Sequence, residues 1–251
     1  MPFRIQHMEC VTTSSDYSCR LQSDFPKEVP VSPFVIGISG PSASGKSELT
    51  SRVEQQFPGC VTVLALDAYY QPLDKVKTLP YEHDNPKAVD LVSVQQHLQM
   101  LKQGKSVKSP IYDFTTHSAS TQTKPLLPRP IVVVEGLYLF WDQQLRDELD
   151  HRIWLQADRS VLLRRRLARD VHPPRNRDKD EILHRFESHV WPAFEEYGAE
   201  CGQHAHVSIV NDDEHFAKLA QALTDLMEHP RLQAVVPNSP GSASATQASQ
   251  P

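Results

Sequence analysis

The chain has 251 residues, with 26 Lys and Arg against 31 Asp and Glu, which gives a formal net charge of −5 at pH 7. This length suits a single α/β domain with tails, and the acidic balance gives no general reason to bind nucleic acid or an anionic membrane. The four cysteines lack a CxxC pair and no apolar run approaches the roughly 20 residues of a membrane span, so we expect a soluble, cytoplasmic protein without a zinc or disulfide framework.

Both ends of the chain differ in composition from the middle. Residues 1–32 are polar and carry Pro26 and Pro30, which indicates a flexible extension before the domain. The end "PNSPGSASATQASQP" buries too little apolar surface to offset its ordering entropy. We therefore predict one domain over 33–230 and a disordered tail over 231–251.

Between these ends, apolar runs of strand length alternate with helical patterns. The predicted strands cover 34–39, 61–66, 131–136, 152–156 and 206–210. The predicted helices cover 46–56, 89–103, 143–149, 159–170, 179–198 and 213–228. This alternation predicts a doubly wound parallel sheet. Residues 104–125 alternate apolar and polar side chains instead, which indicates a β-hairpin insert over the strand ends.

The stretch "GISGPSASGKSELT" follows the first predicted strand, and its Gly40-x-x-x-x-Gly45-Lys46-Ser47 spacing matches the phosphate-binding loop of nucleotide-triphosphate enzymes. The glycines let successive N–H groups point at phosphate oxygens, Lys46 reaches the β- and γ-phosphates, and Ser47 is a Mg²⁺ ligand. An ordinary strand–turn–helix connection is the alternative, and the complete motif disfavours it. The ATP-binding residues predicted from this stretch are Gly40, Ser42, Ser44, Gly45, Lys46, Ser47 and Glu48.

Two carboxylates close predicted strands, where ligands of such sheets bind. Asp67 ends "VTVLALD" and Glu135 ends "IVVVE". A carboxylate at this place is costly unless it faces a cation or water. Solvated strand-end acids are the alternative. We assign Glu135 to Mg²⁺ and Asp67 to the proton of the substrate hydroxyl, with Asp67 also a candidate metal ligand.

The stretch "DRSVLLRRRLARDVHPPRNRD" concentrates six arginines between residues 164 and 177. Arg166 and Arg169 are three residues apart and share a helix face. Guanidinium groups match the charge that phosphoryl transfer spreads over the γ-phosphate oxygens, which indicates an arginine-rich lid over about 164–180. A solvated basic helix face or a nucleic-acid patch is the alternative.

Eight motifs in order resemble those of the uridine kinase (uridine–cytidine kinase) family of P-loop nucleoside kinases, from about residue 34 to 228. They are "GPSASGKS", "LDAYYQPL", "YEHDNPKAVD", "SPIYDFTTHS", "VVVEGLYLF", "RRRLARDV", "RNRD" and "WPAFEEY". The resemblance implies a P-loop kinase fold, ATP and Mg²⁺, and transfer of phosphate to the 5′-hydroxyl of uridine or cytidine. It also implies a homo-oligomer, often a tetramer.

The resemblance also implies roles for matching positions. Asp67 corresponds to the catalytic base, with Lys46 and Arg169 as further catalytic residues. Arg175 and Arg177 correspond to lid arginines at the ATP. The implied substrate-binding residues are Tyr70, Asp84, Tyr112, Phe114, His117 and Arg166.

The chain departs from the family pattern at several positions, which leaves the exact acceptor open. Asn85 stands in "HDNP" where a His is usual, "RNRD" lacks the Gly common between the two arginines, and Arg185 stands where a glutamine is expected. The alternatives are a related kinase acting on nicotinamide riboside or a phosphosugar and, outside the enzymes, a nucleotide-sensing protein. A GTPase-like switch ranks low, because the chain has neither an NKxD segment nor a DxxG after its second strand.

Overall fold

The structure is a computed structural model that describes residues 32–72, 84–113, 118–212 and 216–236. These residues belong to one compact unit, Ser32–Pro251. None of the helices in these ranges combines the length and the apolarity that crossing a bilayer requires.

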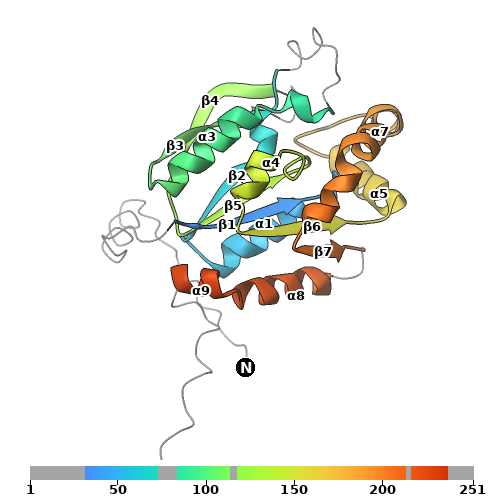
Figure 1. The fold of residues 1–251 in the computed structure, drawn as a ribbon. Helices are drawn as coiled ribbons and strands as arrows, with labels where there is room; N and C mark the ends of the chain where they lie inside the picture. Colours follow the sequence, from blue (N-terminus) through green and yellow to red (C-terminus); the bar gives the residue numbers. More distant parts are fainter. Residues whose placement is uncertain (1–31, 73–83, 114–117, 213–215, 237–251) are drawn as a thin grey trace, which may run out of the picture. The chain divides into compact units, whose positions relative to one another are not determined.

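The centre of the molecule is a parallel sheet with the strand order β2-β5-β1-β6-β7 (Figure 1). Its strands are β1 (Phe34–Ser39), β2 (Val61–Ala65), β5 (Ile131–Gly136), β6 (His151–Gln156) and β7 (Val207–Val210). All five predicted strands are present and pair in parallel, so the predicted doubly wound α/β class is confirmed.

Alternate side chains of the central strands feed two separate hydrophobic cores. Val35 of β1 and Val132 of β5 lie in one core, whereas Phe34 of β1 and Ile131 of β5 lie in the other. Both faces are therefore covered, which explains why these strands are almost continuously apolar in sequence.

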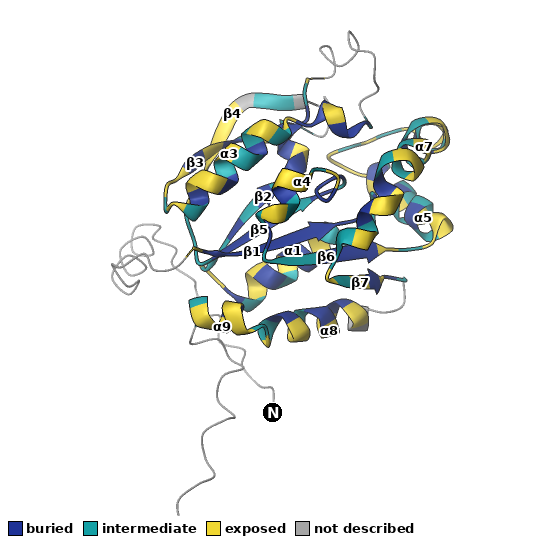
Figure 2. Ribbon diagram, in the orientation of Figure 1, coloured by how far each residue is buried: buried dark blue, intermediate teal, exposed yellow. Residues whose placement is uncertain are grey.

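Helices cover both faces of the sheet (Figures 1 and 2). On one face lie α1 (Lys46–Gln56), α8 (Phe216–Met227) and α9 (Pro230–Val235). On the other lie α3 (Leu91–Lys102) and α4 (Gln143–Asp147). The remaining helices near the carboxyl ends of the strands are α5 (Arg159–Asp170), α6 (Lys179–Arg185) and α7 (Trp191–Ala193).

The predicted hairpin insert forms a second, two-stranded antiparallel sheet of β3 (Val107–Asp113) and β4 (Ser118–Leu126). Val107 and Leu126, which face each other across the hairpin, are buried in the same core as α3. The hairpin is therefore fixed to the side of the sheet that carries β2.

The helix predicted over 179–198 is divided. After α6 the chain widens into π-helical turns at Phe186–Val190 and Phe194–Gly198, separated by the short α7, and then tightens into a 3-10 turn at Ala199–His204. Pro192 has no N–H to donate, which interrupts the regular helical ladder at this point.

The predicted start of the C-terminal tail at residue 231 is wrong. Pro230 begins the helix α9, and Leu232 of this helix is buried in the core that also contains Leu226 of α8. Pro at the first helical position is favourable, because its missing N–H would have had no partner there.

Candidate active site

The phosphate loop, residues 40–47, connects β1 to α1. Gly40 and Gly45 have positive φ angles of 150° and 103°, which favour glycine. A Cβ at Gly45 would come within 2.5 Å of Asn211 Nδ2, and one at Gly40 would collide with the Leu155 carbonyl oxygen. The loop therefore requires both glycines for conformation and for space, as the motif predicted.

Asn211, the residue directly after β7, holds the phosphate loop in place through hydrogen bonds. Its buried side chain donates from Nδ2 to the Ser44 carbonyl oxygen at 2.7 Å. Its own N–H donates to the Gln156 carbonyl oxygen at 2.7 Å, at the end of β6. The shape of the phosphate loop thus depends on the last strand of the sheet, a support that the sequence motif does not contain.

Lys46 lies inside the pocket at the start of α1. Its Nζ donates to the carbonyl oxygens of Gly40 and Pro41 at 3.0 and 2.9 Å. Burial lowers the pKa of the Lys46 ammonium, while the charges of Asp67 and Glu135 act in the opposite direction. A half-buried ammonium held at the phosphate loop is a site for an anionic group.

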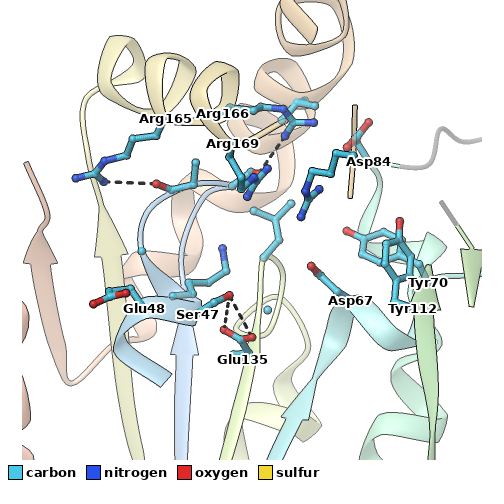
Figure 3. A pocket seen from close by; sticks show the side chains of 18 of the residues that line it. Ser47, Glu48, Asp67, Tyr70, Asp84, Tyr112, Glu135, Arg165, Arg166 and Arg169 are labelled. Atoms are coloured by element: carbon cyan, nitrogen blue, oxygen red, sulfur yellow. Dashed lines mark hydrogen bonds between the residues drawn. The ribbon is translucent and has the colours of Figure 1, made fainter. Parts of the chain in front are cut away.

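Glu135, near the end of β5, lies opposite Ser47 of α1 (Figure 3). The Ser47 hydroxyl lies 3.3 and 3.4 Å from the two carboxylate oxygens, and the Thr50 hydroxyl donates to one of them at 3.3 Å. Burial raises the pKa of Glu135, and Lys46 and the two hydroxyls oppose that shift. A hydroxyl and a carboxylate are thus brought together beside Lys46.

On the other side of the pocket lies a group that we call the tyrosine wall, made of Asp67, Tyr70, Asp84 and Tyr112 (Figure 3). Asp67 lies in a 3-10 turn, Leu66–Tyr69, whose other side chains are buried. The rings of Tyr70 and Tyr112 have centroids 6.3 Å apart. Burial raises the pKa of Tyr112 to about 12 and that of Tyr70 well above its usual value, so both phenols remain protonated near neutral pH.

Asp84 is fixed by two neighbours. Its carbonyl oxygen accepts a 2.5 Å hydrogen bond from the Tyr138 hydroxyl, and its carboxylate forms a 2.8 Å ion pair with Arg185 of α6. Arg185 also lines the pocket, so the residue that departs from the family pattern contacts a predicted substrate residue directly. The neighbouring departure, Asn85, is buried and caps the following turn by accepting from the Lys87 N–H.

The arginines of α5 lie above the phosphate loop (Figure 3). Arg166 donates to the Ser42 hydroxyl at 3.0 Å, and Arg165 donates to the Ala43 carbonyl oxygen at 3.4 Å. The buried stripe of α5 is Leu162, Arg166 and Asp170. The predicted lid helix therefore turns an arginine and an aspartate, together with one leucine, toward the protein.

These residues meet in one pocket of about 480 Å³. Of the predicted site residues, those that line it are Ser42, Gly45, Lys46, Ser47, Glu48, Asp67, Tyr70, Asp84, Tyr112, Glu135, Arg166, Arg169, Arg175 and Arg177. Gly40 and Ser44 do not line it, and the Ser44 side chain is buried beneath the loop. Phe114 and His117 lie outside the described residues.

Sequence reasoning gave no site role to Asp170, Arg185 or Asn211. The sequence did mark Arg185 as unusual, but its partner Asp84 is 101 residues away. No sequence pattern distinguishes Asp170 within the arginine run. Asn211 follows a strand and belongs to no motif.

A phosphate loop beside carboxylates and arginines, at the carboxyl edge of a parallel sheet, defines a P-loop kinase. Residues 35–214 match the Phosphoribulokinase / Uridine kinase family. The chain therefore belongs to this kinase family, as its motifs predicted.

The curated relatives agree with this membership. Uridine-cytidine kinase B of Dictyostelium discoideum is 34% identical over 184 residues, which cover 70% of this chain and 74% of the relative. A uridine kinase of Shewanella amazonensis is 32% identical over 186 residues, covering 70% of this chain and 86% of the relative.

A solved structure of a possible uridine kinase from Bacillus stearothermophilus has a TM-score of 0.53 at 20% identity, over 77% of this chain and 96% of that chain. This likeness supports the shared fold.

Proposed function

We propose that the protein transfers the γ-phosphoryl group of ATP to the 5′-hydroxyl of uridine or cytidine. The observation that carries this proposal is a single pocket with the phosphate loop on one side and the tyrosine wall on the other. A triphosphate bound at the loop would direct its γ-phosphate toward the wall, where an acceptor hydroxyl can lie.

The donor side is suited to ATP. The loop N–H groups and Lys46 would hold the β- and γ-phosphates. Arg165 and Arg166 already contact the loop, and Arg169, Arg175 and Arg177 line the same pocket. Their guanidinium groups would stabilise the charge that develops on the transferred phosphoryl group.

Ser47 and Glu135 fit the expected Mg²⁺. Their oxygens lie 3.3–3.4 Å apart beside the phosphate loop, and Mg²⁺ prefers oxygen ligands. Within the described residues no group of three His, Cys, Asp or Glu side chains could hold an ion, so phosphate and water oxygens would complete its coordination. The bound ion would neutralise charge on the β- and γ-phosphates.

The acceptor side is suited to a neutral nucleoside. Asp84 can accept from paired sugar hydroxyls, and the protonated phenols of Tyr70 and Tyr112 offer flat faces and donors to a base. Asp67 would take the proton of the attacking 5′-hydroxyl.

A phosphosugar acceptor would require additional cations at this wall. Lys105, Lys108 and Lys124 of the hairpin region are exposed and do not line the pocket, and Arg185 is already paired with Asp84. The names of the curated relatives also favour a pyrimidine nucleoside over a phosphosugar or nicotinamide riboside.

The test is a coupled ADP-release assay with Mg·ATP and a panel of acceptors: uridine, cytidine, adenosine, nicotinamide riboside, ribulose 5-phosphate and none. Turnover confined to uridine and cytidine is expected. Turnover with another acceptor alone would keep the phosphate site and overturn the pyrimidine assignment. No turnover with any acceptor, while ATP still binds, would favour a nucleotide-sensing protein.

A further inference from the structure

At the end of α5, the buried carboxylate of Asp170 forms ion pairs with several arginines of the lid. Asp170 has no exposed surface, and its oxygens face the guanidinium groups of three arginines. We call Arg166, Arg169 and Arg175, together with Asp170, the arginine cluster.

The contacts within the arginine cluster differ in strength. Arg169 donates to both carboxylate oxygens, from Nε at 2.7 Å and from Nη2 at 3.3 Å. Arg175 Nε lies 3.3 Å from the same Oδ1, and Arg166 Nε lies 3.5 Å from Oδ2, an ion pair beyond good hydrogen-bond geometry. The Asp170 carbonyl oxygen also accepts from the Arg177 N–H at 3.0 Å. Asp170 thus ties the helix to the loop that follows it.

The cluster has one carboxylate for three guanidinium groups, so its net charge is positive. Without Asp170 the three cations would repel one another inside a pocket that also contains Lys46. Burial alone would raise the pKa of Asp170, but the hydrogen bond from Arg169 and the charges of Arg169, Arg166 and Arg175 hold it below its usual value. The carboxylate therefore stays ionised at neutral pH.

The positive excess faces the phosphate loop. Arg166 contacts Ser42 of the loop at 3.0 Å, and Arg169 and Arg175 line the same pocket. The arginines are thus oriented toward the place where the phosphates of a triphosphate would lie, and Asp170 stands behind them.

We propose that Asp170 is a positioning residue that fixes Arg166, Arg169 and Arg175 in the geometry required to bind the triphosphate and stabilise the transferred phosphoryl group. This inference rests on the proposed function. Asp170 is buried behind the guanidinium groups and acts only through them, since it does not line the pocket.

The test compares Asp170→Asn with Asp178→Asn by calorimetric titration of Mg·ATP and by turnover of uridine. Asp178 lies in the same segment and caps α6 by accepting from the N–H groups of Asp180 and Glu181, a task that Asn also performs. We expect Asp170→Asn to raise the Kd for Mg·ATP about tenfold and to lower kcat about 100-fold, because small misplacements of catalytic groups are costly. Asp178→Asn should resemble the wild-type protein.

The binding stoichiometry separates positioning from a structural role. A merely structural role would leave fewer molecules competent to bind, with an unchanged Kd, whereas positioning changes Kd and kcat at a stoichiometry near one. If Asp170→Asn does not fold, Asp170→Glu keeps the charge but moves it by one methylene, and a severalfold rise in Kd is expected.

An unchanged Kd and kcat in a folded Asp170 variant would overturn the inference alone. A wild-type protein that turns over no nucleoside would overturn the proposed function, and this inference with it.

Discussion

At the scale of single residues, Asp67 and Asp84 face the same pocket but have different surroundings. Asp84 is committed to Arg185 at 2.8 Å and is anchored through Tyr138. Asp67 is exposed to the pocket as the second residue of a turn whose other side chains are buried. A fixed carboxylate suits recognition of an acceptor, and an accessible one suits proton transfer.

Replacing Asp67 by Asn should therefore separate binding from chemistry. We expect kcat with uridine to fall by about 10²–10⁴-fold, the usual contribution of a general base, while the Kd for Mg·ATP changes little. The measurement is steady-state turnover together with nucleotide titration. Asp90→Asn is the matched control, because Asp90 caps α3 by accepting from the Ser93 N–H and Asn also caps. Undiminished turnover in Asp67→Asn would contradict the assignment of Asp67 as the general base.

The residues that sequence reasoning found are those whose spacing is local. Gly40, Gly45, Lys46 and Ser47 form one motif, because a single turn must enclose phosphate. The contact between Asn211 and Ser44 joins residues 167 positions apart, so no local pattern records it. Ion pairs within the lid were equally hidden, since an arginine run does not show which carboxylate its members share.

At the scale of elements, α1 and α5 begin and end where the sequence predicted. The phosphate motif marks the start of α1, and Asp158 precedes α5 in the position where helices favour such residues. The helix predicted over 179–198 has no comparable end signal before Pro192, and its π-helical widening has no sequence period of its own. The helix α9 was not predicted, because its few residues stand directly before a tail whose composition is typical of disorder.

Three histidines lie close together where β6, β7 and α9 begin. His151 begins β6, His206 precedes β7 and His229 precedes α9. The His151 ring centroid lies 5.6 Å from that of His206 and 5.3 Å from that of His229. Arg152 adjoins this group, and Arg231 forms an ion pair with Asp150 beside it. Burial, with the charges of His229, His206 and Arg152, lowers the pKa of His151 from 6.5 to about 4.

This cluster predicts a loss of stability in mild acid. Between pH 6.5 and about 4 the unfolded chain binds a proton at His151 that the folded chain does not bind, so the free energy of unfolding falls as the pH falls. Because His151 is partly exposed, we expect a loss of about 1–2 kcal/mol, below the full linkage value. Urea unfolding at pH 7.5 and pH 5 measures it.

The variant His151→Gln should flatten this pH dependence, whatever its effect on stability at neutral pH. The exposed His184 provides the matched control, and His184→Gln should leave the dependence as it is. An equal pH dependence in wild type and His151→Gln would contradict the assignment to this cluster.

At the scale of the whole molecule, the pocket and the chain carry net charges of opposite sign. The chain carries −5, yet the pocket is lined by Lys46 and six arginines against four carboxylates. The cations lining the pocket are Lys46, Arg165, Arg166, Arg169, Arg175, Arg177 and Arg185. A positive cleft in an acidic protein concentrates small anions at one place while keeping polyanions from the remaining surface.

Filling this cleft should stabilise the entire domain. At a Mg·ATP concentration 100 times the Kd, binding adds about 2.7 kcal/mol to the free energy of unfolding, which corresponds to a rise in Tm of roughly 5–10 °C for a domain of this size. Thermal unfolding with and without Mg·ATP measures the shift. Lys46→Ala should abolish it, whereas Lys102→Ala, which breaks the ion pair with Glu148 between α3 and α4, should retain it. A shift in Lys46→Ala as large as in wild type would place the nucleotide elsewhere.

Synthesis from the N-terminus delivers β1 and β2 first, yet these strands are not neighbours, because β5 lies between them. Until residues 131–136 leave the ribosome, both strands have unpaired edges and apolar faces, the features that drive aggregation of nascent chains. Asn211, which hydrogen-bonds to the phosphate loop, is synthesised later still, directly after β7. We therefore expect chains truncated before β5 to require holding chaperones, and nucleotide binding to appear only when nearly the whole domain has been translated.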